Sequence, residues 1–235
     1  MMLSIEGLKV KIGNLRIIQG VDLVQSEGEI VSLMGANGAG KTTLMRAISG
    51  LYPVSSGKIE FMGEDITRLS SEKIVDAGLI QIPEGRQLFP LMSVRENLEI
   101  GAHTPQARKK AKHNLEYVYS IFPELSQMSS MPAGNLSGGQ QQMVAIARGI
   151  MADPRLLILD EPSIGLSPIM TQKVFESIVQ INRNGVAILI AEQNIYDVLD
   201  IASRAYVLEQ GVIRKSGTAA QILASNEIKA MYLGL

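Results

Sequence analysis

The chain has 235 residues, 46% of them hydrophobic, and a formal net charge of -1 at pH 7. This length suits one large domain or two small ones, and the apolar content is normal for a globular core. The lysines and arginines are scattered, which argues against a nucleic-acid-binding protein, and the lack of cysteine excludes disulfides and thiolate metal sites.

The N-terminal segment lacks the pattern of a secretion signal. Charges at Glu6 and Lys9 interrupt it, and it has no long apolar core. The strongly apolar stretches, such as 185–191, are far shorter than the ~20 residues of a membrane helix. We therefore expect a cytoplasmic protein, and any membrane role must depend on a partner.

An apolar run at 29–34 predicts a strand, and it leads into a glycine-rich octet that fits G-x-x-x-x-G-K-[ST] and precedes a helical pattern. This context predicts a P-loop (residues 35–42), in which backbone amides and a helix N-terminus surround phosphates. Lys41 is expected to reach the β- and γ-phosphates, and the Thr42 hydroxyl to bind Mg²⁺. The expected nucleotide contacts are Gly35, Ala36, Asn37, Gly38, Ala39, Gly40, Lys41, Thr42 and Thr43.

The segment from about 93 to 150 differs from its surroundings. It has helical periodicity and few β-branched residues, and Ser93 with Glu96 forms a capping-box pattern at its start. We interpret it as a helical subdomain, at about 90–150, inserted into a single domain that spans 1–235.

The pentad Leu136-Ser137-Gly138-Gly139-Gln140, here called the signature pentad, precedes a helical pattern at 141–151. Ser137 is expected to cap this helix at its N-terminus. The glycines leave backbone amides open to an anion, so the pentad predicts a second phosphate-binding site. The expected contacts are Ser137, Gly138, Gly139 and Gln140.

A further apolar run, 156–159, leads directly into Asp160 and Glu161. Open α/β sheets place their ligands at the carboxyl ends of strands. Asp160 is expected to hold Mg²⁺ through water. Glu161 is expected to polarise the water that attacks the γ-phosphate, which is the positioning role that phosphoryl transfer needs.

Strands continue to alternate with helices in the last third of the chain. Ser167 and Pro168 predict the N-cap and first residue of a helix that ends near Arg183, and a buried strand is expected at 186–191. This alternation predicts an α/β fold with a largely parallel core sheet.

The C-terminal elements are expected to be antiparallel and helical. Short apolar segments flank Gln210-Gly211, which predicts a hairpin. Thr218 with Gln221 then predicts a capped last helix.

The P-loop, the signature pentad and the LLILDEP strand end together resemble the ATP-binding cassette (ABC) ATPases, and the resemblance covers nearly the whole chain. It implies a P-loop NTPase fold, ATP and Mg²⁺ as ligands, and ATP hydrolysis. It also implies that two such subunits pair head to tail, so that each ATP lies between one P-loop and the partner's signature pentad. Members of this kind drive transmembrane permease subunits.

Four segments narrow the resemblance to the LivF-type subunit of branched-chain amino acid importers. They are 82–86 (IPEGR), 160–168 (DEPSIGLSP), 191–194 (AEQN) and 230–234 (AMYLG). The resemblance implies ATP-driven solute import, a peripheral place on the cytoplasmic face of the inner membrane, and indirect dependence on a periplasmic solute-binding protein.

Three positions depart from the wider family, which usually has glutamine at Glu84, aspartate at Ser167 and a switch histidine at Gln193. Glu84 is expected to face the Mg²⁺ and, when ATP leaves, to repel Asp160 and Glu161. Ser167 keeps the N-cap function. Gln193 is expected to contact the γ-phosphate through a neutral amide and to be a weaker catalytic element, so we expect a heterodimer in which the second cassette supplies a histidine.

The family's usual adenine-stacking aromatic aligns with Ile12, which implies an aliphatic contact with the base instead of a stack.

Other interpretations stay open. A urea or short-amide importer has a similar cassette, because other subunits select the solute. Lipopolysaccharide exporters retain the switch histidine, and Gln193 weighs against them. Chromosome and DNA-repair members of the superfamily, which are nucleotide switches, carry long coiled coils, but only about 95 residues separate Lys41 from Ser137. Translation-associated members carry two cassettes, whereas this chain has one P-loop.

Overall fold

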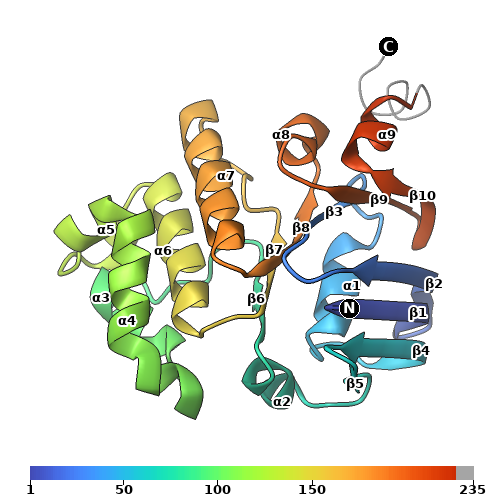
Figure 1. Ribbon diagram of the computed structural model, residues 1–235, viewed down its shortest axis with the longest axis horizontal. Helices are drawn as coiled ribbons and strands as arrows, with labels where there is room; N and C mark the ends of the chain where they lie inside the picture. Colours follow the sequence, from blue (N-terminus) through green and yellow to red (C-terminus); the bar gives the residue numbers. More distant parts are fainter. Residues whose placement is uncertain (226–235) are drawn as a thin grey trace.

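The computed structural model describes residues 1–225 and contains two sheets with helices around them (Figure 1). A six-stranded sheet has the order β10-β9-β3-β8-β7-β6, and a four-stranded sheet has the order β2-β1-β4-β5. The strands are β1 (Leu3–Ile12), β2 (Leu15–Gln25), β3 (Ile30–Met34), β4 (Val54–Phe61), β5 (Glu64–Asp65), β6 (Leu79–Ile82), β7 (Leu156–Asp160), β8 (Ala187–Glu192), β9 (Arg204–Glu209) and β10 (Val212–Thr218).

The central strands of the six-stranded sheet, β3, β7 and β8, are buried on both faces. The sheet's strands β3, β6, β7, β8 and β9 pair in parallel, and only β10 is antiparallel. In β7, Leu157 and Leu159 pack into one apolar cluster, while Leu156 and Ile158 pack into a second cluster on the opposite face. Two buried faces explain why these strands read as continuous apolar runs, so the predicted parallel core sheet is confirmed.

Different elements cover the two faces. Helix α1 and the antiparallel sheet share one cluster with the central strands, whereas α3, α4, α6, α7 and α8 share the other. The helices that follow β6, from α3 to α6, lie together at one end of the molecule, far from the antiparallel sheet (Figure 1). The helices are α1 (Lys41–Ile48), α2 (Ser71–Asp76), α3 (Val94–Gly101), α4 (Pro105–Ile121), α5 (Pro123–Gln127), α6 (Gly138–Met151), α7 (Pro168–Arg183), α8 (Ile195–Leu199) and α9 (Ala219–Leu223), with a 3-10 turn at Ala133–Asn135.

The predicted helix caps are present. Ser93 accepts the amide of Glu96, whose carboxylate in turn accepts the amide of Ser93, which completes a capping box at α3. Ser167 caps α7, with Pro168 as its first residue, and Thr218 caps α9. These side chains satisfy N–H groups that the first helical turn leaves open.

The predicted hairpin is also confirmed. Strands β9 and β10 pair around Gln210 and Gly211, whose φ angles are 47° and 78°. Two successive positive φ angles match a type I′ turn, the turn whose twist suits a tight hairpin. A Cβ on Gly211 would clash with the Ile17 carbonyl oxygen, so the hairpin also packs closely on β2.

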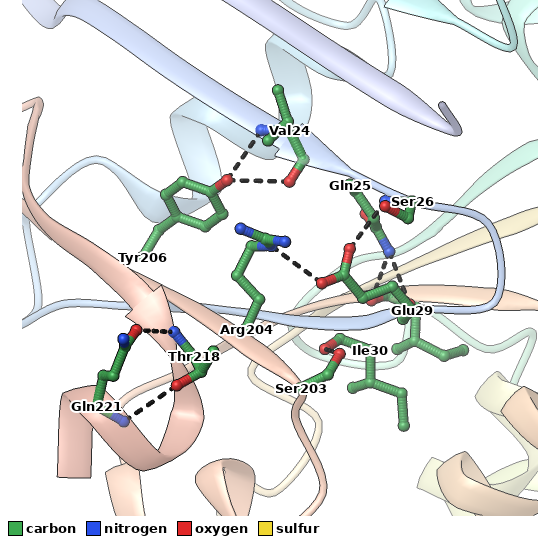
Figure 2. A network of polar contacts seen from close by, with 11 residues as sticks. Val24, Gln25, Ser26, Glu29, Ile30, Ser203, Arg204, Tyr206, Thr218 and Gln221 are labelled. Atoms are coloured by element: carbon green, nitrogen blue, oxygen red, sulfur yellow. Dashed lines mark hydrogen bonds and ion pairs between the residues drawn. The ribbon is translucent and has the colours of Figure 1, made fainter. Parts of the chain in front are cut away.

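Polar contacts fix the antiparallel sheet to the central one (Figure 2). The Tyr206 hydroxyl on β9 accepts the Val24 amide at 3.0 Å and donates to the Val24 carbonyl at 2.9 Å. The Gln25 side chain donates to the Ile188 carbonyl, and the Arg204 guanidinium donates to Glu29 at 2.9 Å. This network lies near the amino ends of β3 and β8, away from the P-loop.

Among residues 1–225, no helix is both long and apolar enough to cross a membrane. The 230–234 segment, on which part of the resemblance depends, lies outside the described residues.

Candidate active site

The P-loop connects β3 to α1, as predicted. Gly40 stands at the N-cap with φ 109°, a left-handed conformation that favours glycine. The Lys41 side chain is 4% exposed, and its ammonium donates to the Gly35 carbonyl at 2.7 Å. The loop therefore holds one buried cation beside open backbone amides, a combination suited to phosphate.

A cavity of about 440 Å³ opens on the P-loop. It brings together P-loop residues with two of the predicted acids, Glu84 and Glu161, and with two apolar side chains that were not predicted. Its lining is Ile17, Ala36, Asn37, Gly38, Gly40, Lys41, Thr42, Thr43, Glu84, Glu161 and Ile164.

Asp160 lies at the end of β7 and is only 3% exposed. The Thr42 hydroxyl donates to its Oδ1 at 3.2 Å, and its Oδ2 is buried with no hydrogen-bond partner among the described residues. Burial raises the pKa of Asp160, and the charges of Glu161 and Glu84 raise it further. An unpartnered carboxylate oxygen beside a hydroxyl is a donor set that Mg²⁺ accepts.

Glu161 follows Asp160 with φ 48°, which turns its side chain away from the path of the strand. Its amide donates to the Ala191 carbonyl at 2.9 Å, so the turn is anchored to β8. The Glu161 side chain is 11% exposed, and its carboxylate lies 3.0 Å from the Lys41 ammonium. The predicted general base therefore contacts the predicted phosphate-binding lysine directly.

Glu84 lies in the loop after β6 and is exposed at the cavity wall. Its charge acts on Asp160 in the sense expected from the sequence, since it raises the pKa of that carboxyl. The two acids come from neighbouring strands, because β6 pairs with β7.

Gln193 follows the last residue of β8, between the P-loop strand β3 and the carboxylate strand β7. Its side chain is exposed, and it does not belong to the cavity lining given by the described residues. The predicted γ-phosphate contact stays a prediction.

The signature pentad lies at the start of α6. Ser137 caps the helix, as predicted, and the structure adds a capping box with Gln140. No pentad residue is among the described residues that line the P-loop cavity. Within one chain, then, the two predicted phosphate sites are separate.

Ile12 is the last residue of β1 and is exposed. In the described part of the chain the cavity is lined by Ile17 of β2 and not by Ile12, whose contact with adenine stays a prediction.

Sequence reasoning missed two groups near these motifs. Arg86 donates to the Gln141 side chain at 3.3 Å, and a Cβ on Gly138 would lie 3.2 Å from its guanidinium, so Arg86 lies against the signature pentad. Glu192 is a buried carboxylate at the end of β8. The only signal for Glu192 was an acid at the end of an apolar run, the same signal that located Asp160.

Comparisons with known proteins agree with this geometry. A family model described as ABC transporter matches residues 18–164. The high-affinity branched-chain amino acid transport ATP-binding protein BraG of Pseudomonas aeruginosa is 40% identical, over 99% of this chain and 100% of that protein. The lipopolysaccharide export system ATP-binding protein LptB of Haemophilus influenzae is 33% identical, over 99% of this chain and 97% of that protein.

Solved structures are similar over the full chain. A nucleotide-free ATP-binding cassette from an ABC transporter superposes with a TM-score of 0.88 at 25% identity, covering 100% of this chain and 99% of that one. The ADP conformation of the cassette MJ1267 superposes with a TM-score of 0.87 at 26% identity, with the same coverage of both chains. The chain belongs to the ABC transporter family, as one of its ATP-hydrolysing ATP-binding cassettes.

Proposed function

We propose that this chain powers an ABC importer of branched-chain amino acids. The 40% identity to BraG over essentially all of both chains carries the assignment, and a probable branched-chain amino acid transport ATP-binding protein LivF of Archaeoglobus fulgidus is 33% identical over 94% of each. Gln193 supports the assignment further, because lipopolysaccharide exporters are expected to keep a switch histidine at this position.

The P-loop would hold the triphosphate. Phosphate oxygens entering the cavity take hydrogen bonds from the backbone amides and compete with Glu161 for the Lys41 ammonium. Glu161 then becomes available to accept a hydrogen bond from the attacking water. Binding of the nucleotide thus releases the general base in the same step.

The residues at the strand ends fit Mg²⁺. Asp160 and Thr42 would hold the ion, with Glu84 facing it from the neighbouring loop after β6. Within residues 1–225, no three His, Cys, Asp or Glu side chains form a metal cluster by themselves. This agrees with a Mg²⁺ site that keeps waters and uses substrate phosphates as ligands. The ion would neutralise charge on the phosphates, while Lys41 and Glu161 orient them and the water.

A second cassette would complete the site. Since the signature pentad does not line the chain's own cavity, we propose that Ser137, Gly138, Gly139 and Gln140 bind the partner's γ-phosphate, and that the partner's pentad serves this P-loop. We further propose a heterodimer, because Gln193 cannot take up a proton as an imidazole can. The helices at 90–150 would act as the subdomain that presents the pentad.

The remaining partners are proposals from the same resemblance. Permease subunits would anchor the chain to the cytoplasmic face of the inner membrane, and they would receive solute from a periplasmic binding protein. The loop between β6 and α3 supports the permease contact, because Phe89 and Leu91 expose large apolar side chains there.

The test is transport by the assembled complex. Vesicles that contain this chain, its permeases and its second cassette should take up labelled leucine, isoleucine or valine when Mg-ATP is supplied on the side of the cassettes. A complex carrying Glu161→Gln should not. Uptake of urea or short amides but none of these amino acids, or ATPase activity stimulated by lipopolysaccharide, would replace the proposed solute with the corresponding alternative.

A further inference from the structure

One buried acid beside the site has no part in the chemistry described so far. Glu192 is the last residue of β8, is paired with Met34 at the end of the P-loop strand, and is 2% exposed. Its Oε1 accepts the Ser163 amide at 2.9 Å, and its Oε2 accepts the Gln193 amide at 3.3 Å. We propose that Glu192 is a positioning residue, whose carboxylate ties the loop after Glu161 to the loop that carries Gln193.

The two loops follow neighbouring parallel strands, β7 and β8, and so leave the sheet at the same edge. The first begins at Glu161, includes Ile164 on the cavity wall, and ends at Ser167, which caps α7. The second carries Gln193 from β8 into α8. Glu192 is buried behind both, outside the cavity lining, so it acts on the nucleotide only through the residues that it holds.

A charged side chain is a costly way to fill this position. Burial raises the pKa of Glu192, and the nearby charge of Glu161 raises it further, while hydrogen bonds from Ser163 lower it. An apolar residue would avoid that cost but would leave the Ser163 amide without its acceptor. The hydrogen bond from the Ser163 amide to Oε1 is the one that joins the two loops, because Gln193 directly follows Glu192 in the chain.

This arrangement predicts a loss of turnover without a loss of ATP binding. The P-loop and Lys41 hold the nucleotide, whereas Glu192 fixes where Glu161 and Gln193 stand. Misplacement of a catalytic group by about 1 Å costs on the order of 100-fold in rate. The inference rests on the ATPase role of the chain and on the proposed contact of Gln193.

Three substitutions of Glu192 separate the effect of the hydrogen bond from Ser163 from the effect of the negative charge. Glu192→Gln keeps an acceptor at the same reach but loses the charge, and Glu192→Met keeps the volume but has no oxygen. Glu192→Asp keeps the charge but is one methylene too short. We expect Glu192→Met and Glu192→Asp to lower kcat about 10- to 100-fold, with KM for Mg-ATP within about 2-fold, and Glu192→Gln to stay within about 3-fold of wild type.

Hydrogen exchange gives a readout that does not depend on activity. Backbone amides in segments 161–167 and 193–199 should exchange faster together in Glu192→Met and stay protected in Glu192→Gln. Glu29→Ala is the matched control, because Glu29 also joins two segments by accepting the Ser26 amide and the Arg204 side chain, but at the other end of the sheet (Figure 2). It should lower the melting temperature and leave kcat unchanged.

The results separate cleanly. Wild-type turnover in Glu192→Met would overturn the proposed positioning role of Glu192. Higher turnover in Glu192→Asp than in Glu192→Gln would overturn it as well. If Glu192→Met does not fold at the assay temperature, the comparison of Glu192→Asp with Glu192→Gln decides alone. Absence of ATPase activity in the wild-type complex would instead overturn the proposed function.

Discussion

Replacing Glu161 by glutamine should separate ATP binding from ATP hydrolysis. The carboxylate lies 3.0 Å from the Lys41 ammonium, and both side chains are nearly buried. A hydrogen bond to a charged acceptor is worth roughly 1 kcal/mol more than one to a neutral amide, so glutamine should free Lys41 for phosphate and tighten ATP binding about 5-fold. Loss of the general base should lower turnover by about 100-fold or more.

Three measurements follow from this reasoning. Calorimetry gives the ATP affinity, steady-state hydrolysis gives kcat, and size-exclusion chromatography with Mg-ATP should show a trapped dimer. Glu84→Gln is the matched control. Glu84 lies on the same cavity wall, but Lys41 forms its ion pair with Glu161 and not with Glu84, so this variant should not trap the dimer. Turnover in Glu161→Gln within about 3-fold of wild type would refute the assignment of the base.

Three other changes test separate parts of the site. Gln193→Ala should slow turnover about 10- to 100-fold at saturating Mg-ATP, whether the chain is alone or with the partner cassette. If the variant matches the wild-type rate in both settings, Gln193 has no catalytic role. Ile12→Tyr should tighten ATP binding about 5- to 100-fold if this position faces adenine, whereas unchanged affinity together with weaker binding by Ile17→Ala would place the base against Ile17. Because burial raises the pKa of Asp160, Asp160→Asn should raise the melting temperature without nucleotide when the pH is above that pKa, and the gain should vanish as the pH falls to the ordinary value of 3.8; a lower melting temperature at neutral pH would contradict this.

The features that sequence predicted well are local ones. The P-loop, the caps at Ser93 and Ser167 and the Gln210-Gly211 hairpin each depend on residues within a few positions of one another, so spacing alone determines them. The buried strands were visible because both of their faces are covered, which leaves no polar alternation.

The features that sequence did not reveal depend on contacts between distant segments. Ile17 reaches the P-loop because the antiparallel sheet packs on the central one, and Lys41 meets Glu161 across 120 positions because β3 and β7 flank β8. Glu192 was within a recognised segment, but its partner Ser163 lies on another loop. No spacing rule could have paired them.

The central claim is that each ATP is hydrolysed between one chain's P-loop and the signature pentad of another. Lys41→Ala disables the first and Gly138→Glu places a negative charge in the second, so each variant alone should be inactive. When the two variants are mixed in equal amounts without the second cassette, this chain pairs only with itself, and half of the dimers contain one intact composite site. The mixture should then regain about one quarter of the turnover of the wild-type chain alone. A mixture no more active than its two components would contradict the account.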